Sequence, residues 1–260
     1  MKIALVSLNQ TWENKNKNLE LCRKYIQKAS SENSDLIIFP EMTLTGFSNN
    51  IKLISEDFDN SKTIKQFSNF AKEFNIAIIF GIVIKDNQKA LNKCLFLDNF
   101  GNILSDYSKI HPFSFSGEDK FFNPGNKLSI VEFKKFKIGL TICYDLRFPE
   151  LYSSLAKECD LIINIANWPS KRVDHWNTLL KARAIENQIF IAGVNRTGID
   201  GNDLEYIESS NIFNANGEEL EFEKYEDMKI YDININFTKE FKRKFNTVND
   251  RKVQFYKEIL

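Results

Sequence analysis

The chain has 260 residues, and 35 lysines and arginines balance 35 aspartates and glutamates. Zero formal net charge leaves no positive excess to attract a phosphate backbone, which argues against a nucleic-acid partner. No apolar run approaches the roughly 18 residues that a membrane span needs, and the N-terminus becomes polar too early for a secretory signal, so we expect a cytoplasmic protein without a membrane partner.

Apolar spacing in the first part of the chain predicts alternating strands and helices. In order, we expect a strand over 3–8, a helix over 14–30, a strand over 35–39, a helix over 61–74, and strands over 76–84 and 90–97. Pro40 ends the ladder of the second strand and leaves Glu41 at its carboxyl end. Because α/β folds place sites at that end of a sheet, Glu41 is a candidate functional residue.

The second part of the chain begins with a long aromatic loop. Lys109 opens this irregular stretch over 110–126, which we expect to be ordered and functional. Beyond it we expect strands over 128–133 and 137–142, a helix over 148–157, a strand over 160–166, a helix over about 174–187, strands over 189–195, 207–213 and 229–235, and a charged tail. No repeat or low-complexity linker divides the chain, which favours a single α/β domain over 1–260.

The cysteine and histidine content limits the possible chemistry. The four cysteines contain no C-x-x-C pair, so neither a disulfide framework nor a zinc finger is expected; they are Cys22, Cys94, Cys143 and Cys159. With only His111 and His175 available, the sequence predicts no histidine-rich metal centre.

Cys143 lies between a predicted strand and a predicted helix. Such a turn lifts a side chain out of the sheet and exposes backbone N–H groups, including that of Tyr144, to a reacting centre. A thiol with a pKa of about 8.5 is only slightly ionised at neutral pH, so catalysis would need a base or a positive neighbour. A lone cysteine after an apolar strand is more often a packing residue, so its surroundings must decide its role.

Three segments together resemble a known family. Phe39-Pro40-Glu41-Met42, the segment Tyr107 to Phe113, and Cys143-Tyr144-Asp145-Leu146-Arg147-Phe148-Pro149-Glu150 resemble the Glu, Lys and Cys signatures of the nitrilase, or carbon-nitrogen hydrolase, superfamily. Gly117-Glu118, Asn167-Trp168-Pro169 and the segment 182–188 extend the similarity, which is greatest to the bacterial ω-amidase-like branch. The resemblance implies a four-layer α-β-β-α sandwich of the nitrilase type, a homodimer or larger homo-oligomer, and no cofactor or metal.

The resemblance also implies catalytic roles. Cys143 would attack a small amide, such as an ω-amide of a dicarboxylic acid like α-ketoglutaramate, and form a thioester with loss of ammonia. Glu41 would transfer the protons, a contribution commonly worth about 10² to 10⁴ in rate. Lys109 and the Tyr144 N–H would stabilise the oxyanion. Glu118 would orient Lys109 or the attacking water.

Residues for substrate binding are less sharply defined. Phe115, Tyr144 and Trp168 are candidates for the pocket walls. Arg147 and Arg172 are candidates for gripping a substrate carboxylate, since a guanidinium can donate two parallel hydrogen bonds to one. Arg147 could equally pair with a neighbouring carboxylate, and the sequence identifies no definite set for the acid end.

The two histidines are expected to lie outside the chemistry. His111 allows a papain-like interpretation in which a histidine activates Cys143. We expect His111 instead to anchor the loop through hydrogen bonds. His175 is expected to be structural or at the pocket rim. Arg183 and Glu186 are expected to be structural or interfacial ions.

Other functions stay open at this point. The same three residues could hydrolyse a nitrile or an N-carbamoyl compound, because they do not select the acyl group. A catalytically silent binding protein on the same fold is a second alternative. A redox-sensing thiol is a third, with Cys159 as the candidate resolving cysteine.

Overall fold

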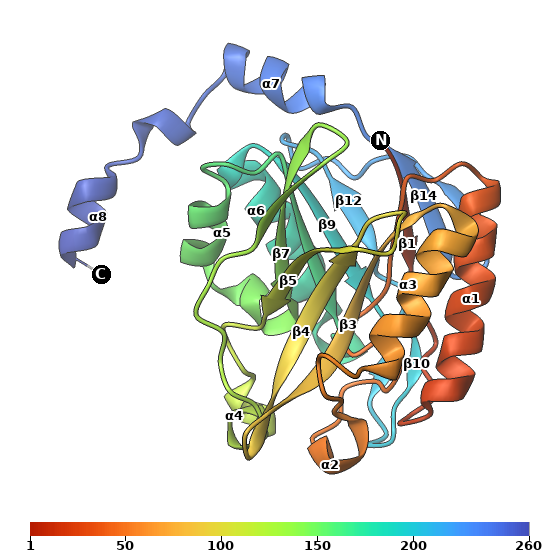
Figure 1. The fold of residues 1–260 in the computed structure, drawn as a ribbon. Helices are drawn as coiled ribbons and strands as arrows, with labels where there is room; N and C mark the ends of the chain where they lie inside the picture. Colours follow the sequence, from red (N-terminus) through yellow and green to blue (C-terminus); the bar gives the residue numbers. More distant parts are fainter. Residues whose placement is uncertain (260) are drawn as a thin grey trace.

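In the computed structural model, which describes residues 1–259, two sheets pack face to face between layers of helices (Figure 1). The seven-stranded sheet has the order β13-β14-β1-β2-β3-β4-β5, with β1 Lys2–Val6, β2 Leu36–Ile38, β3 Ala77–Asp86, β4 Lys89–Leu97, β5 Ile103–Ser108, β13 Glu223–Tyr225 and β14 Met228–Asp232. The five-stranded sheet has the order β12-β9-β8-β7-β6, with β6 Ile130–Phe133, β7 Phe136–Ile142, β8 Leu161–Ala166, β9 Phe190–Asn195 and β12 Asn211–Phe213.

Helices cover the outer face of each sheet. The larger sheet is covered by α1 (Lys15–Ser31) and α3 (Lys62–Phe74), and the smaller one by α5 (Pro149–Leu155) and α6 (Val173–Asn187). The layers therefore follow the order α-β-β-α, which confirms the expected sandwich. The shorter elements are α2 Ile51–Ile54, η1 Ser114–Ser116, α4 Glu118–Phe121, η2 Cys143–Arg147, η3 Ser170–Arg172, β10 Gly198–Ile199 and β11 Glu205–Tyr206.

The alternation of side chains along each strand explains why both faces of each sheet are packed. On β1, Ile3 and Leu5 enter the core between the two sheets, whereas Ala4 and Val6 enter the core under α1 and α3. Successive side chains of a strand point to opposite faces, so a strand buried on both sides is apolar throughout. The central strands β1, β2 and β3 run parallel, as do β7, β8 and β9, which brings the carboxyl ends within each group to one edge.

The structure corrects the expectation of a strand over 207–213. The strand β12 begins only at Asn211. Before it, the Ser209 carbonyl accepts the Trp176 Nε1–H at 2.8 Å, and the Ser210 hydroxyl binds the backbone of Asn195. These side-chain contacts replace the ladder that a longer strand would have formed.

The charged tail forms helices that the sequence pattern did not predict. These are α7 (Ile235–Lys244), the turn η4 (Val248–Asp250) and α8 (Val253–Ile259). The ring of Phe237 in α7 packs against Phe190 of β9 with ring centres 5.9 Å apart, whereas α8 lies outside the sandwich (Figure 1). Within residues 1–259, no helix is both long and apolar enough to cross a membrane.

Candidate active site

The expected site residues follow strands of both sheets. Glu41 follows β2, Lys109 follows β5, and Cys143 follows β7. The turn at Glu41 requires the glycine beneath it, because a Cβ on Gly81 would lie 2.3 Å from the Met42 nitrogen. Close approach of two backbones is a position that only glycine tolerates.

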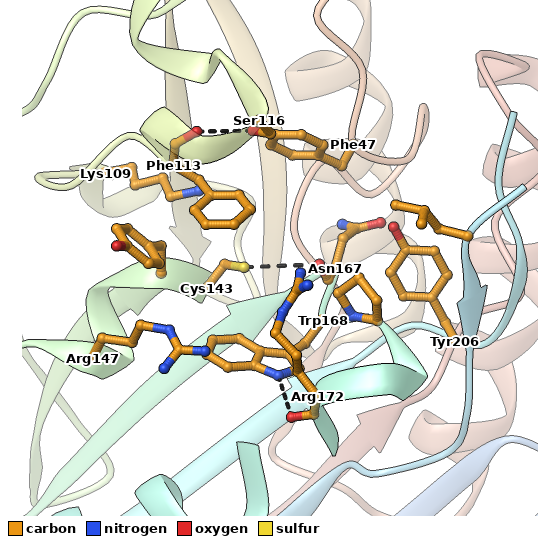
Figure 2. A pocket seen from close by; sticks show the side chains of 13 residues that line it. Phe47, Lys109, Phe113, Ser116, Cys143, Arg147, Asn167, Trp168, Arg172 and Tyr206 are labelled. Atoms are coloured by element: carbon orange, nitrogen blue, oxygen red, sulfur yellow. Dashed lines mark hydrogen bonds between the residues drawn. The ribbon is translucent and has the colours of Figure 1, made fainter. Parts of the chain in front are cut away.

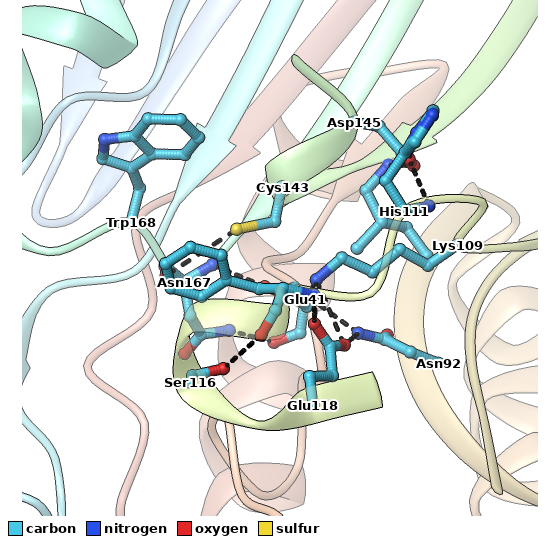
Figure 3. Close-up of polar contacts among 12 residues, drawn as sticks. Glu41, Asn92, Lys109, His111, Ser116, Glu118, Cys143, Asp145, Asn167 and Trp168 are labelled. Carbon is cyan, nitrogen blue, oxygen red and sulfur yellow. Dashed lines mark hydrogen bonds and ion pairs between the residues drawn. The ribbon is translucent and has the colours of Figure 1, made fainter. Parts of the chain in front are cut away.

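Glu41, Asn92, Lys109 and Glu118 form what we call the charged cluster (Figure 3). The Lys109 Nζ donates to Glu41 Oε1 at 3.0 Å and to Glu118 Oε2 at 2.8 Å. Asn92 Nδ2 donates to both carboxylates, at 2.8 Å to Glu41 and 3.0 Å to Glu118. All four side chains are at most 2% exposed. A lysine between two buried carboxylates is thus held in a fixed position, as expected for a group that must act on a reacting atom.

The charges of the cluster determine the state of Lys109. Burial alone would lower the pKa of this ammonium, but the negative charges of Glu118 and Glu41 outweigh burial and raise the pKa well above its ordinary value. Lys109 therefore carries a positive charge throughout the physiological range.

The same surroundings act oppositely on Cys143. Burial raises the pKa of the Cys143 thiol, and Glu41 raises it further, against the opposing pull of Lys109. The resting sulfur is accordingly a thiol rather than a thiolate. Any attack by this sulfur needs a group that removes its proton.

The backbone at Cys143 is strained and held by side chains. Its φ of 47° lies in the left-handed region, which is uncommon for a residue with a Cβ. The Cys143 N–H donates to Asn164 Oδ1 at 3.0 Å, and the sulfur lies 3.8 Å from the Asn167 carbonyl. Because the Cys143 amide is occupied, the adjacent Tyr144 amide remains the candidate backbone donor to a substrate oxygen.

Asn167 connects the nucleophile to the charged cluster. Its backbone N–H donates to Glu41 Oε2 at 2.9 Å, and its side chain donates to the Glu41 carbonyl at 2.6 Å. The same residue presents its carbonyl to the Cys143 sulfur. Glu41 is therefore a fully buried carboxylate with three donors, and not a solvated carboxylate at the end of a strand.

Asp145 fastens the nucleophile turn to the end of β5. Its buried carboxylate accepts the Ile142 N–H at 3.0 Å, the Tyr107 hydroxyl at 2.7 Å and the His111 N–H at 3.0 Å. The His111 ring also pairs with Asp145 through Nδ1 at 2.7 Å and stacks on Phe148. His111 is thus the loop-anchoring hydrogen bonder that the sequence predicted.

A cavity that is partly open to solvent adjoins Cys143 (Figure 2). Cys143, Lys109, Tyr144, Arg147 and Trp168 all line it, as expected. The other lining residues are Phe47, Phe113, Ser116, Asn167, Pro169, Arg172, Leu204 and Tyr206.

Phe115 differs from the expectation that it walls the pocket. Its side chain is 88% exposed and does not line the cavity, whereas Phe113 does. The segment forms the 3₁₀ turn η1, in which residues three apart share a side. Phe113 and Ser116 therefore face the cavity, and Phe115 points outward between them.

Arg147 and His175 occupy the rim together. Arg147 Nη2 lies 3.2 Å from His175 Nδ1, and its guanidinium lies 5.0 Å from the centre of the Trp168 ring. Within residues 1–259, Arg147 forms no ion pair with Asp145 or Glu150, the neighbouring carboxylates that the sequence offered. Arg183 has the structural role expected of it, since it donates to the Leu146 carbonyl and pairs with Glu186.

Sequence reasoning missed the asparagines of the site. Asn92 and Asn164 are buried polar residues on β4 and β8, and in β8 the asparagine interrupts an otherwise apolar strand, which was the available signal. A buried amide needs hydrogen-bond partners, so such a residue indicates a polar network behind the strand.

The four-layer sandwich, with a buried lysine between two carboxylates beside a strand-end cysteine, defines the nitrilase class of fold and site. The chain belongs to the carbon-nitrogen hydrolase family, whose model matches residues 2–243. It is 34% identical to the omega-amidase YafV of Escherichia coli strain K12 over 84% of this chain and 83% of that protein. It is also 34% identical to a 2-oxoglutaramate amidase of Paenarthrobacter nicotinovorans, over 86% of this chain and 80% of that protein.

Solved structures agree with this assignment. A CN-hydrolase superfamily protein from Xanthomonas campestris, solved with an arsenic adduct in its active site, superimposes with a TM-score of 0.89 at 30% identity, over 97% of each chain. An amidase from Nesterenkonia, in which acrylamide has added to the active site cysteine, has a TM-score of 0.87 at 21% identity over the full length of both chains. The second likeness concerns the fold alone.

Proposed function

We propose that this protein hydrolyses small carboxamides to a carboxylic acid and ammonia, with ω-amides of dicarboxylic acids such as α-ketoglutaramate as its substrates. The observation that carries the proposal is the buried ammonium of Lys109, held between Glu41 and Glu118 beside Cys143. The names of the two amidase relatives support the same reaction.

In the first half of the reaction, Glu41 removes the proton from the Cys143 thiol, and the sulfur attacks the amide carbon. The raised pKa of the thiol makes this proton transfer necessary. Negative charge develops on the amide oxygen, where the Lys109 ammonium and the Tyr144 N–H stabilise it. Donors fixed in advance cost no reorganisation during the reaction.

The second half releases the products. Protonated Glu41 returns its proton to the amide nitrogen, the carbon–nitrogen bond breaks, and ammonia leaves a thioester on Cys143. Glu41 then takes a proton from water as its oxygen attacks the thioester carbon. The carbon–sulfur bond breaks, the acid leaves, and the sulfur recovers a proton from Glu41. Glu118 contributes by holding Lys109 and does not exchange a proton.

Ammonia release from a panel of amides, nitriles and N-carbamoyl amino acids tests this proposal, with Cys143→Ala as the blank. We expect turnover of ω-amides and a transient mass increase on Cys143 equal to the acyl group. A clear preference for nitriles or carbamoyl compounds would replace the amide proposal. Absence of both turnover and an acyl adduct with every compound would favour a binding protein.

We also propose that two copies associate through the C-terminal arm, the segment 235–259 that carries α7 and α8. Arg251 anchors the arm to the C-terminal end of α6, at the Glu186 carbonyl and Asn187 Oδ1. Beyond that anchor, Phe255, Tyr256 and Ile259 are exposed, and a helix of this length is not stable without packing. Light scattering should give the mass of a dimer or larger oligomer, and Phe255→Ser with Tyr256→Ser should lower it. A monomeric native chain would refute this proposal.

We also propose that the protein is located in the cytoplasm. All four cysteines are free, and the mechanism requires Cys143 to stay reduced, which a reducing compartment favours. Recovery of the protein outside the cytoplasm on cell fractionation would contradict it.

A further inference from the structure

We infer that Arg172 is an anion subsite of the pocket, where its guanidinium binds the carboxylate at the far end of the substrate from the amide. This assignment rests on the proposed amidase function. It names the residue that would make the enzyme select amides bearing a second, negatively charged end.

The position of Arg172 is fixed by its backbone. It is the last residue of the turn η3, directly before α6. Its carbonyl accepts the Trp168 Nε1–H at 2.7 Å, so the backbone is tied to the indole that forms one wall of the cavity. Figure 2 shows the side chain rising from this point into the cavity, on the side of Cys143.

The guanidinium of Arg172 has no charged partner in the described chain. Within residues 1–259 it forms neither a salt bridge nor a hydrogen bond, and its contact is with the Phe113 ring, 5.7 Å from the ring centre. Lys109, by contrast, has both Glu41 and Glu118. Arg172 thus keeps all its N–H donors for a ligand, and two of them match the spacing of a carboxylate.

Arg147 is less suited to this role. Its Nη2 already lies against His175 Nδ1, and its guanidinium stacks on Trp168. Arg147 therefore contributes positive charge to the pocket rim, whereas Arg172 offers free hydrogen-bond donors inside it.

The rest of the pocket suits the same class of ligand. Three cationic side chains line the cavity, namely Lys109, Arg147 and Arg172, and none of its lining residues is an aspartate or glutamate. Apolar side chains fill much of the remaining wall, including Phe47, Phe113 and Leu204. Such a wall fits a short methylene chain between an amide at Cys143 and a carboxylate at Arg172.

A matched pair of substrates tests the assignment. Glutaramate carries the distal carboxylate, and pentanamide has a similar chain without the charge. We expect Arg172→Gln to lower kcat/KM for glutaramate by about 10²-fold, mainly through KM, because a charge-assisted pair is lost. For pentanamide the change should stay within about threefold. Lys171→Gln, on the same turn but exposed, is the matched control and should change neither value.

A competition measurement separates binding from catalysis. Glutarate should inhibit pentanamide hydrolysis by the native enzyme, and Arg172→Gln should raise its inhibition constant by at least about tenfold. Arg172→Lys should give an intermediate constant, since lysine keeps the charge but loses the paired donors.

The outcomes distinguish the subsite from the proposed function. If the native enzyme hydrolyses amides but Arg172→Gln affects glutaramate and pentanamide equally, the amidase function stands and the subsite is refuted. If circular dichroism shows that Arg172→Gln is unfolded, Arg172→Lys decides, and unchanged glutarate inhibition in it refutes the paired-donor subsite. If the native enzyme releases ammonia from no amide, the proposed function fails and the subsite falls with it.

Discussion

The charged cluster and the pocket wall border the same cavity but are built in different ways. Glu41, Asn92, Lys109 and Glu118 are fully buried and joined by several hydrogen bonds. Arg147 and Arg172, in the wall, are only partly buried and have few polar contacts. The cluster fixes the chemistry through rigid contacts, whereas the wall leaves donors free for the substrate. Substitutions in the cluster should therefore affect every substrate, and those in the wall should affect particular ones.

The largest effect should come from the nucleophile at the boundary between the two regions. We expect Cys143→Ala to abolish ammonia release, with a loss on the order of 10⁶, as found when other enzymes lose a nucleophile. Cys159→Ala is the matched control, because Cys159 is also a free cysteine but is buried against Gly139 under the smaller sheet. Comparable activity in both variants would refute thioester catalysis by Cys143.

Glu41→Gln should separate two effects of one carboxylate. Ammonia release should fall by about 10² to 10⁴, because the proton acceptor is lost. The pKa of the Cys143 thiol should fall as well, since Glu41 raises it and Lys109 still lowers it. More thiolate should therefore form at neutral pH in a less active enzyme, as measured by ultraviolet absorbance of the thiolate during a pH titration. A thiol pKa that stays constant or rises would contradict the role given to Glu41.

Lys109→Met should damage both catalysis and folding. Loss of the oxyanion donor should lower kcat by about 10² to 10³. Two buried carboxylates would also lose their cation, which should lower the free energy of unfolding by about 3–5 kcal/mol. Kinetics and urea denaturation measure these effects. Lys93→Met removes a buried lysine that pairs with Asp106 outside the pocket, and it should leave kcat nearly unchanged. A loss of kcat equal to that of Lys109→Met would contradict the role of Lys109 as the oxyanion donor.

The smallest effects should distinguish two phenylalanines of the wall. Phe113→Ala should raise KM several-fold, because this ring lines the cavity and contacts Tyr144 and Arg172. Phe115→Ala should change KM and stability little, since the side chain is exposed. Steady-state kinetics on one amide is sufficient. A larger effect at Phe115 would mean that the loop closes over the ligand.

Sequence patterns predicted the chemical centre better than its surroundings. Glu41 and Cys143 each follow a predicted strand, and Lys109 opens the predicted aromatic loop in a segment that resembles the family's Lys signature, so local patterns were enough to find them. Asn167 could not be tied to Glu41 in the same way, because the two residues lie 126 positions apart and meet only when the sheets pack. The placement of Phe113 rather than Phe115 depended on a short 3₁₀ turn, which apolar periodicity does not reveal.

The secondary structure, too, was predicted well where local patterns are strong and poorly where tertiary contacts decide. The helices α1 and α3 were predicted closely, because each has strong apolar spacing and a capping side chain, Asn14 and Ser61. The ribbon of β10 and β11 has only two residues in each strand, too few to show any periodicity. Short elements of this kind are set by tertiary contacts.

The links made by Asp145 and Asn167 have a consequence for the order of folding. Asp145 joins the end of β5 to the nucleophile turn, and Asn167 joins Glu41 to the sulfur, so both links cross from one sheet to the other. Neither sheet alone can assemble the site, and contacts so distant in sequence form slowly. During refolding, enzymatic activity should therefore return later than the far-ultraviolet circular dichroism signal, which reports the formation of secondary structure.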